Sequence, residues 1–224
     1  MVLLLVLVLA QVAFILNQVQ GENLRVWNTN VQKKLASSSR FGGGVTITET
    51  GWVGMGIADT PGRGVIVFEK RDQSTGAWSA PIERMQGNPP GLGSYGYYFG
   101  HDVAMTDTDM ITGGYANHGG AYIYKRSSDD TKWVLSASLQ TNMYGDHFGV
   151  SVAISDTYAL VGSNYDGYNP GLKAYIFPKK SDGSWSTASQ RVWQGPKGFG
   201  SDVALTDSFC IVGSSTIANI YAYD

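Results

Sequence analysis

The dipeptide Phe-Gly opens the same short phrase four times along the chain, and this repeat constrains the fold more than any other feature. The four copies begin at Phe41, Phe99, Phe148 and Phe199, at intervals of 58, 49 and 51 residues. In each copy apolar residues stand four, six and twelve positions after the Phe, and an acid stands eight positions after it. The acids are Glu49, Asp107, Asp156 and Asp207. A register kept through four copies predicts a repeat architecture built from one structural unit.

Each copy has the pattern of a small antiparallel sheet. Phe148, Val152 and Ile154 alternate with polar or small residues, which is typical of a strand with one buried face. The acid, flanked by Ser or Thr, predicts a tight turn rather than a catalytic or metal-binding carboxylate. A second apolar run, a third strand such as AYIF at 174–177, and a strand opened by a Trp complete the unit. The Trp residues are Trp78, Trp133 and Trp185. We expect four strands in each unit of about 50 residues.

The ends of the chain predict how the units close. The fourth copy stops after its third strand, and Trp27 precedes Phe41 at the spacing that separates Trp185 from Phe199. We therefore predict an all-β fold: a β-propeller of four four-stranded antiparallel blades, closed by the N-terminal strand. Residues 23–35 would form the outer strand of the last blade, within one domain spanning 22–224.

The phrase FG-x-x-VA-x-[ST]-D, followed by VGS, AYIF and a Trp, resembles the FG-GAP repeat family, which includes the propeller of integrin α chains. The resemblance covers 24–224 and implies a propeller with a role in ligand binding or adhesion. Integrin-type repeats often hold calcium between their first two strands, but the loops TETG, TDTD, SDTY and TDSF lack the oxygen ligands that calcium needs. We therefore expect no metal site and no cofactor.

The first 21 residues predict a secretory signal peptide. Val2 to Leu16 is nearly unbroken apolar sequence, and Val19 and Gly21 suit a cleavage site. The alternative is a membrane anchor, although the run is shorter than the roughly 20 apolar residues of a spanning helix. The expected location is secreted, extracellular or on the cell surface, without membrane insertion after signal removal. The net charge of −2 gives no basis for nucleic-acid binding.

Sequence patterns give no basis for catalysis. The chain lacks the Gly-x-Ser-x-Gly, HExxH and phosphate-loop motifs, and its single cysteine, Cys210, falls on a predicted strand as a buried residue. We therefore expect no enzyme activity and no catalytic residue.

The predicted function is recognition, through the face that carries the long loops between the second and third strands and between successive units. Aromatic side chains with Asn and His suit contact with a protein or glycan ligand. The candidate ligand-binding residues are Tyr95, Tyr97, Tyr98, Tyr115, Asn117, His118, Tyr144, His147, Tyr165 and Tyr168. The prediction is a secreted or cell-surface, non-catalytic recognition or adhesion module, monomeric, with an open array that dimerises as the alternative. The alternative function is a carbohydrate-active enzyme, a glycosidase or lyase, which would need two carboxylates in one cleft.

Overall fold

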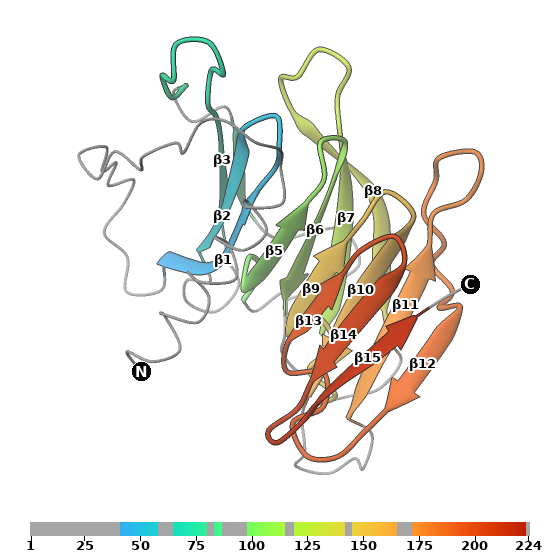
Figure 1. Ribbon diagram of the computed structural model, residues 1–224. Coiled ribbons are helices and arrows are strands. Elements are labelled where there is room, and N and C mark those ends of the chain that lie inside the picture. Colours follow the sequence, from blue (N-terminus) through green and yellow to red (C-terminus); the bar gives the residue numbers. More distant parts are fainter. Residues whose placement is uncertain are drawn as a thin grey trace, which may run out of the picture. The chain divides into compact units, whose positions relative to one another are not determined.

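A computed structural model describes residues 41–57, 65–79, 83–86, 98–114, 119–141, 145–164 and 172–222. Throughout these ranges the regular secondary structure is β, in four antiparallel sheets (Figure 1). In each sheet, strands consecutive in the chain are neighbours, so every sheet is a meander. None of the described residues form a helix with the length and hydropathy of a membrane span.

The strands follow the predicted repeat. The first sheet comprises β1 (Phe41–Ile47), β2 (Trp52–Ile57), β3 (Val65–Lys70) and β4 (Glu83–Gln86). The second comprises β5 (Asp102–Met105), β6 (Asp109–Gly114), β7 (Gly120–Arg126) and β8 (Trp133–Gln140). The third comprises β9 (Ser151–Ile154), β10 (Tyr158–Ser163), β11 (Lys173–Pro178) and β12 (Arg191–Gln194). The fourth comprises β13 (Val203–Leu205), β14 (Phe209–Gly213) and β15 (Ala218–Ala222).

Three of the four sheets therefore have the four strands that the sequence predicts, and the fourth has three strands among the described residues. The predicted outer strand at 23–35 and the closure that it would provide lie outside the described ranges, as does the predicted signal peptide. The Trp residues differ in part from the prediction. Trp133 opens β8, but Trp78 and Trp185 form isolated bridges to Arg71 and Lys179, ahead of their outer strands.

The first strands of the sheets, β1, β5, β9 and β13, lie beside one another in sequence order (Figure 1). Hydrophobic clusters join the sheets pairwise. Phe148, fully buried, packs from the third sheet against Ile111 and Ile123 of the second, and Phe199 does the same from the fourth sheet against Leu160 of the third. In the second, third and fourth sheets, the repeated Phe is therefore the side chain that anchors the sheet on the one before it.

The repeated Gly residues explain the rest of the phrase. A Cβ added to Gly113 would lie 1.8 Å from the carbonyl oxygen of Gly149, and one added to Gly162 would lie 2.1 Å from that of Gly200. Such contacts exclude every side chain, so the Gly that stands next to last in β6 or β10 receives the Phe-Gly turn of the next sheet. The Phe-Gly turn and the Gly near the end of the preceding sheet's second strand are thus the two halves of one contact between sheets.

The repeated acids also act between sheets, at the end where first and second strands are joined. Thr50 donates a hydrogen bond to Asp107 at 2.5 Å, and Thr157 donates one to Asp207 at 2.8 Å, in each case from the preceding sheet. Hydroxyl donors at Ser155 and Thr157 hold the pKa of Asp207 below its ordinary value. The structure therefore places these two acids in the structural role predicted for them, and adds that they link neighbouring sheets.

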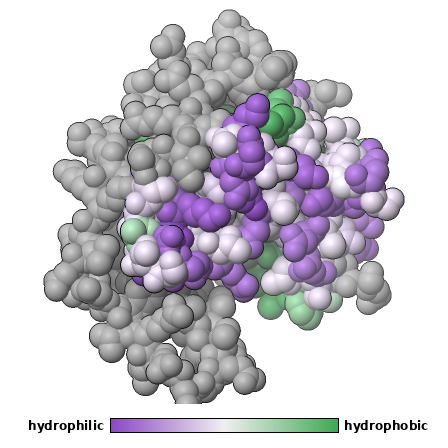
Figure 2. All heavy atoms as spheres, turned by 90° about the horizontal axis from the view of Figure 1, so that it is seen from above, coloured by the Kyte–Doolittle hydropathy of each residue, from purple (hydrophilic) through white to green (hydrophobic). Residues whose placement is uncertain are grey.

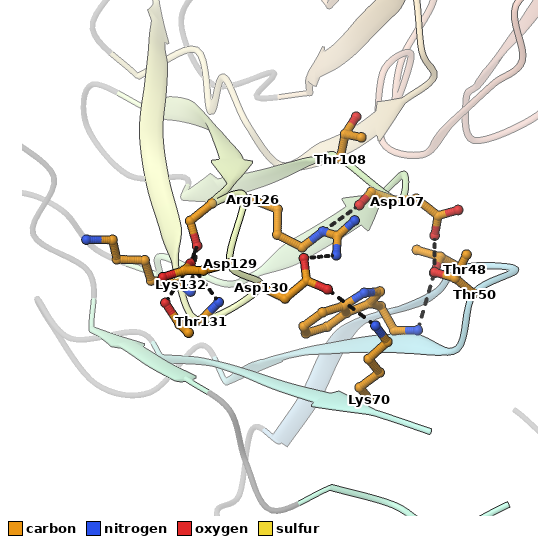
Figure 3. Close-up of polar contacts among 12 residues, drawn as sticks. Thr48, Thr50, Lys70, Asp107, Thr108, Arg126, Asp129, Asp130, Thr131 and Lys132 are labelled. Atoms are coloured by element: carbon orange, nitrogen blue, oxygen red, sulfur yellow. Dashed lines mark hydrogen bonds and ion pairs between the residues drawn. The ribbon is translucent and has the colours of Figure 1, made fainter. Parts of the chain in front are cut away.

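A charged network continues the link between the first two sheets (Figure 3). Asp130 pairs with Arg126 of its own sheet and with Lys70 of the first sheet, at 3.4 Å in the latter case. Both cations lie over the indole of Trp52, at 5.1 Å for Lys70 and 5.2 Å for Arg126. A different ion pair joins the second and third sheets, in which Lys179 contacts the buried carboxylate of Asp109 at 2.7 Å.

Candidate functional site

One position of the repeat brings polar side chains to the same end of neighbouring first strands. The third residue after each Phe is Gly44, Asp102, Ser151 and Asp202 in the four copies. Asp102 and Ser151 are the first residues of β5 and β9, and Asp202 directly precedes β13. Left-handed glycines set this position, because Gly100, Gly149 and Gly200 have φ values of 79°, 92° and 81° and turn the chain into each strand.

Asp102 is held firmly by backbone donors. Its Oδ1 accepts a hydrogen bond from its neighbour, the Val103 amide, at 2.9 Å. Its Oδ2 accepts one from the Val152 amide of the third sheet at 2.8 Å. The carboxyl group therefore spans two sheets and has a fixed orientation.

Burial raises the pKa of Asp102 to about 6, although the two amide donors act in the opposite direction. The negative charge of Asp202 adds to the increase. Asp202 itself is exposed, so the pair joins a carboxyl group that is partly withdrawn from water with one that is solvated. Two carboxyl groups in such different environments can take different proton-transfer roles.

Two further polar side chains flank the pair. Nδ1 of His101 lies 3.0 Å from the Val150 carbonyl oxygen, and burial lowers the pKa of His101, which favours a neutral imidazole with Nδ1 as the donor. Ser151 donates its hydroxyl proton to the Gly200 carbonyl at 2.8 Å. Because this proton is held by a carbonyl rather than by a base, Ser151 lacks the activation that a nucleophilic serine needs.

The arrangement suits general acid–base chemistry. A proton donor that acts near neutral pH needs a pKa close to the working pH, and Asp102 approaches this condition. The acids that stand out in the sequence are the turn residues eight positions after each Phe. Asp102 and Asp202 are less apparent, because Gly44 and Ser151 hold the same position in the other two copies. The signal was present in the register, since the third position after Phe carries an acid in the second and fourth copies.

Of the ten predicted ligand-binding residues, only Tyr98 and His147 lie within the described ranges. Both precede the Phe of a repeat, and both have left-handed backbone angles, φ 65° and φ 50°. Gly198 holds the same position in the fourth copy with φ 78°. The position is thus one of turn geometry, and burial lowers the pKa of His147. The other eight lie outside the described ranges: Tyr95, Tyr97, Tyr115, Asn117, His118, Tyr144, Tyr165 and Tyr168.

Other candidate chemistry is limited in the described part of the chain. Cys210 is fully buried in the fourth sheet, and burial raises the pKa of its thiol, in keeping with the structural role predicted for it. Within the same ranges, His, Cys, Asp and Glu side chains form no group of three that could hold a metal ion.

Comparisons with known proteins agree with the repeat. Residues 142–177 match the FG-GAP repeat family, which confirms the resemblance seen in the sequence for that segment. The chain is similar to the solved structure of the periplasmic gluconolactonase PpgL of Pseudomonas aeruginosa, with 16% sequence identity and a TM-score of 0.44. That match covers 70% of this chain and 46% of the other, so the chain spans less than half of the gluconolactonase. A comparison with curated proteins gives no match.

The predicted function needs correction. We expected a non-catalytic recognition or adhesion module, but the similar solved protein is an enzyme by its title, and the prediction is wrong against that finding. The ten ligand-binding residues named for the long-loop face stay a prediction, because eight of them lie outside the described ranges.

Proposed function

We propose that the protein is a carbohydrate-active enzyme in which Asp102 supplies the proton and Asp202 is the second carboxylate. One observation carries the proposal: a carboxyl group with its pKa raised to about 6 lies under the influence of a second, exposed carboxylate. A pair of this kind is the usual equipment of enzymes that cleave glycosidic bonds, where one carboxylic acid protonates the leaving oxygen and the other acts as base or nucleophile. The reaction class is therefore glycoside cleavage.

The roles follow from the two environments. Asp102 is protonated in a larger fraction near pH 6 than an ordinary Asp, so it is the better proton donor. Asp202 is exposed, so its carboxyl group is open to solvent and could stabilise positive charge that develops on the sugar or activate water. His101, held by the Val150 carbonyl, positions the segment that leads into Asp102.

The scaffold that we propose is a β-propeller to which each chain contributes four blades. The four consecutive antiparallel meanders and the FG-GAP match at 142–177 support it. We also propose a location outside the cytoplasm, on the basis of the apolar run at the start of the chain.

The test is a release assay for reducing sugars on a panel of aryl glycosides and polysaccharides. We expect the wild-type chain to cleave at least one of them, with a rate that falls as pH rises through about 6, since Asp102 must be protonated. Asp102→Asn should lower the rate by about 100-fold or more, the usual contribution of a general acid. Asp202→Asn should slow the reaction and move the alkaline limb to lower pH, because removal of its charge lowers the pKa of Asp102.

Asp207→Asn is the matched control, since Asp207 is also exposed and belongs to the fourth copy but bonds Thr157 at the opposite end of the strands. It should leave the rate and the pH profile unchanged. Melting curves of all three variants separate loss of chemistry from loss of fold. An Asp102→Asn variant that keeps the wild-type rate, or a wild-type chain inactive on the whole panel, would contradict the proposal.

A further inference from the structure

The outward face of the fourth sheet is apolar and exposed. Ala204 pairs with Ile211, and Ile211 pairs with Ile220, so these three side chains form a row across β13, β14 and β15. Phe209 lies on the same face and is 53% exposed, and Ile220 is 69% exposed. Figure 2, seen from above, shows apolar side chains at the margin of a largely hydrophilic face.

In each of the two preceding sheets, the same row is packed against the next sheet. In the third sheet it consists of Ala153, Leu160 and Ile176, all buried against the fourth sheet. In the second sheet it consists of Ala104, Ile111 and Ile123, packed against the third sheet. At two junctions within the chain, this row of residues contacts the next sheet. The fourth sheet has apolar residues at the same three positions but exposes them.

The first sheet exposes the complementary surface. Val45 and Ile47 of β1 are 67% and 70% exposed. Their counterparts in β9, Val152 and Ile154, are buried in the cluster that joins the third sheet to the second. The fourth sheet thus exposes the surface on which a following sheet packs. The first sheet exposes the surface with which a sheet packs on the one before it.

A glycine supports the same reading. Gly213 stands where Gly113 and Gly162 stand in their sheets, and those two residues contact the carbonyl oxygens of the next Phe-Gly turns. Among the described residues, the nearest atom to a Cβ added at Gly213 is the Asp202 carbonyl oxygen of its own sheet, at 3.3 Å. The position is shaped for a Phe-Gly turn, yet no described turn occupies it.

We propose that two copies of this chain assemble head to tail, with the fourth sheet of each packed on the first sheet of the other. The interface continues the junctions already present within the chain, so it needs no new type of contact. Two identical contacts close the assembly with twofold symmetry, which leaves neither face exposed. Burial of large aliphatic and aromatic side chains provides the driving force. This inference is independent of the proposed chemistry at Asp102.

The oligomeric state of the full chain tests the proposal, by light scattering after size-exclusion chromatography. We expect the mass of two chains. Ile220→Arg on the fourth sheet, Ile47→Glu on the first, and Gly213→Ala should each yield the mass of one chain, with the circular dichroism spectrum unchanged. Val134→Arg is the control, because Val134 is 50% exposed on β8 and lies outside both surfaces; it should remain dimeric.

A cysteine pair separates two copies from closure within one chain. In Ile47→Cys with Ile220→Cys, oxidation should produce a covalent dimer on a non-reducing gel if the copies meet head to tail. A disulfide within a single chain would show that the first and fourth sheets of one copy meet, and would overturn the proposal. A wild-type chain with the mass of one copy at every concentration, or a dimer that survives all three interface variants, would also overturn it.

Discussion

Replacing Lys179 with Met should destabilise the protein strongly at neutral pH and weakly at acid pH. Lys179 donates to Asp109 across the junction between the second and third sheets, at 2.7 Å. Asp109 has no exposed surface, and its other oxygen accepts a hydrogen bond from Nε1 of Trp185 at 3.0 Å. Met keeps most of the side-chain volume of Lys but removes the charge, so an ionised carboxylate is left in the interior without its cation.

The magnitude follows from this burial. Breaking a buried pair by removing one partner costs about 3–5 kcal/mol, because the remaining charge stays desolvated. Burial alone would raise the pKa of Asp109, but hydrogen bonds from Lys179, Trp185 and Thr108 together hold it below the ordinary value. In the wild type, therefore, this carboxylate contributes stability above its unfolded pKa and loses it as pH falls through the folded pKa. In the variant its pKa should rise, so the penalty should shrink towards low pH, where the group is neutral.

Urea denaturation at neutral pH and near pH 4, about the ordinary pKa of Asp, measures both effects. Lys180→Met is the control, because Lys180 is adjacent and exposed and should change the free energy of unfolding little. Asp109→Asn combined with Lys179→Met should recover part of the loss, since the amide can still accept from Trp185 and carries no charge. A loss under about 1 kcal/mol at neutral pH, or one that does not depend on pH, would refute the reasoning.

Three other outcomes follow from the same contacts. Phe148→Ala should lower the free energy of unfolding by about 3–5 kcal/mol, as truncation of a fully buried aromatic does, and chemical denaturation that shows less than about 1 kcal/mol would contradict its anchoring role. The raised pKa of Asp102 contributes stability below its unfolded pKa that is lost as pH rises towards about 6, at most about 3 kcal/mol, so Asp102→Asn should flatten the stability curve over pH 4–6; an unchanged slope would contradict the shift. Gly162→Ala should unfold the third and fourth sheets' junction and lower the melting temperature, whereas Gly213→Ala should leave the fold of the chain intact.

Much of the architecture was predictable, because the same pattern of strands and turns occurs in all four copies of the repeat. Period-two alternation after each Phe predicts a half-buried strand, and the acid between hydroxyls predicts the turn after it. Boundaries were harder to predict. Trp185 reads as the start of an outer strand, but its indole Nε1 donates to Asp109 of the second sheet, and β12 begins only at Arg191. The local sequence pattern does not predict that a side chain binds a residue of a neighbouring sheet.

The candidate site was less predictable, for a physical reason. The pKa of Asp102 depends on the Val152 amide and on Asp202, which are 50 and 100 residues away in the chain. His101 precedes Asp102 in the chain, but its imidazole contacts the Val150 carbonyl of the third sheet. Chemistry that arises between strands of different sheets becomes visible only after the sheets are placed side by side.

The repeated Phe and Gly residues lie at the contacts between sheets rather than within the sheets, and the structure explains why. Within a sheet, backbone hydrogen bonds tolerate many side chains, so strands need only an apolar face. Between sheets, the Phe fills a buried site, the Gly of Phe-Gly takes a left-handed turn, and the Gly near the end of the second strand admits a carbonyl oxygen. None of these three positions accepts a substitute without loss of contact. The fourth sheet has these contact residues at an exposed face, namely Gly213 and the row of Ile211 and Ile220. It can therefore bind a further sheet of the same kind.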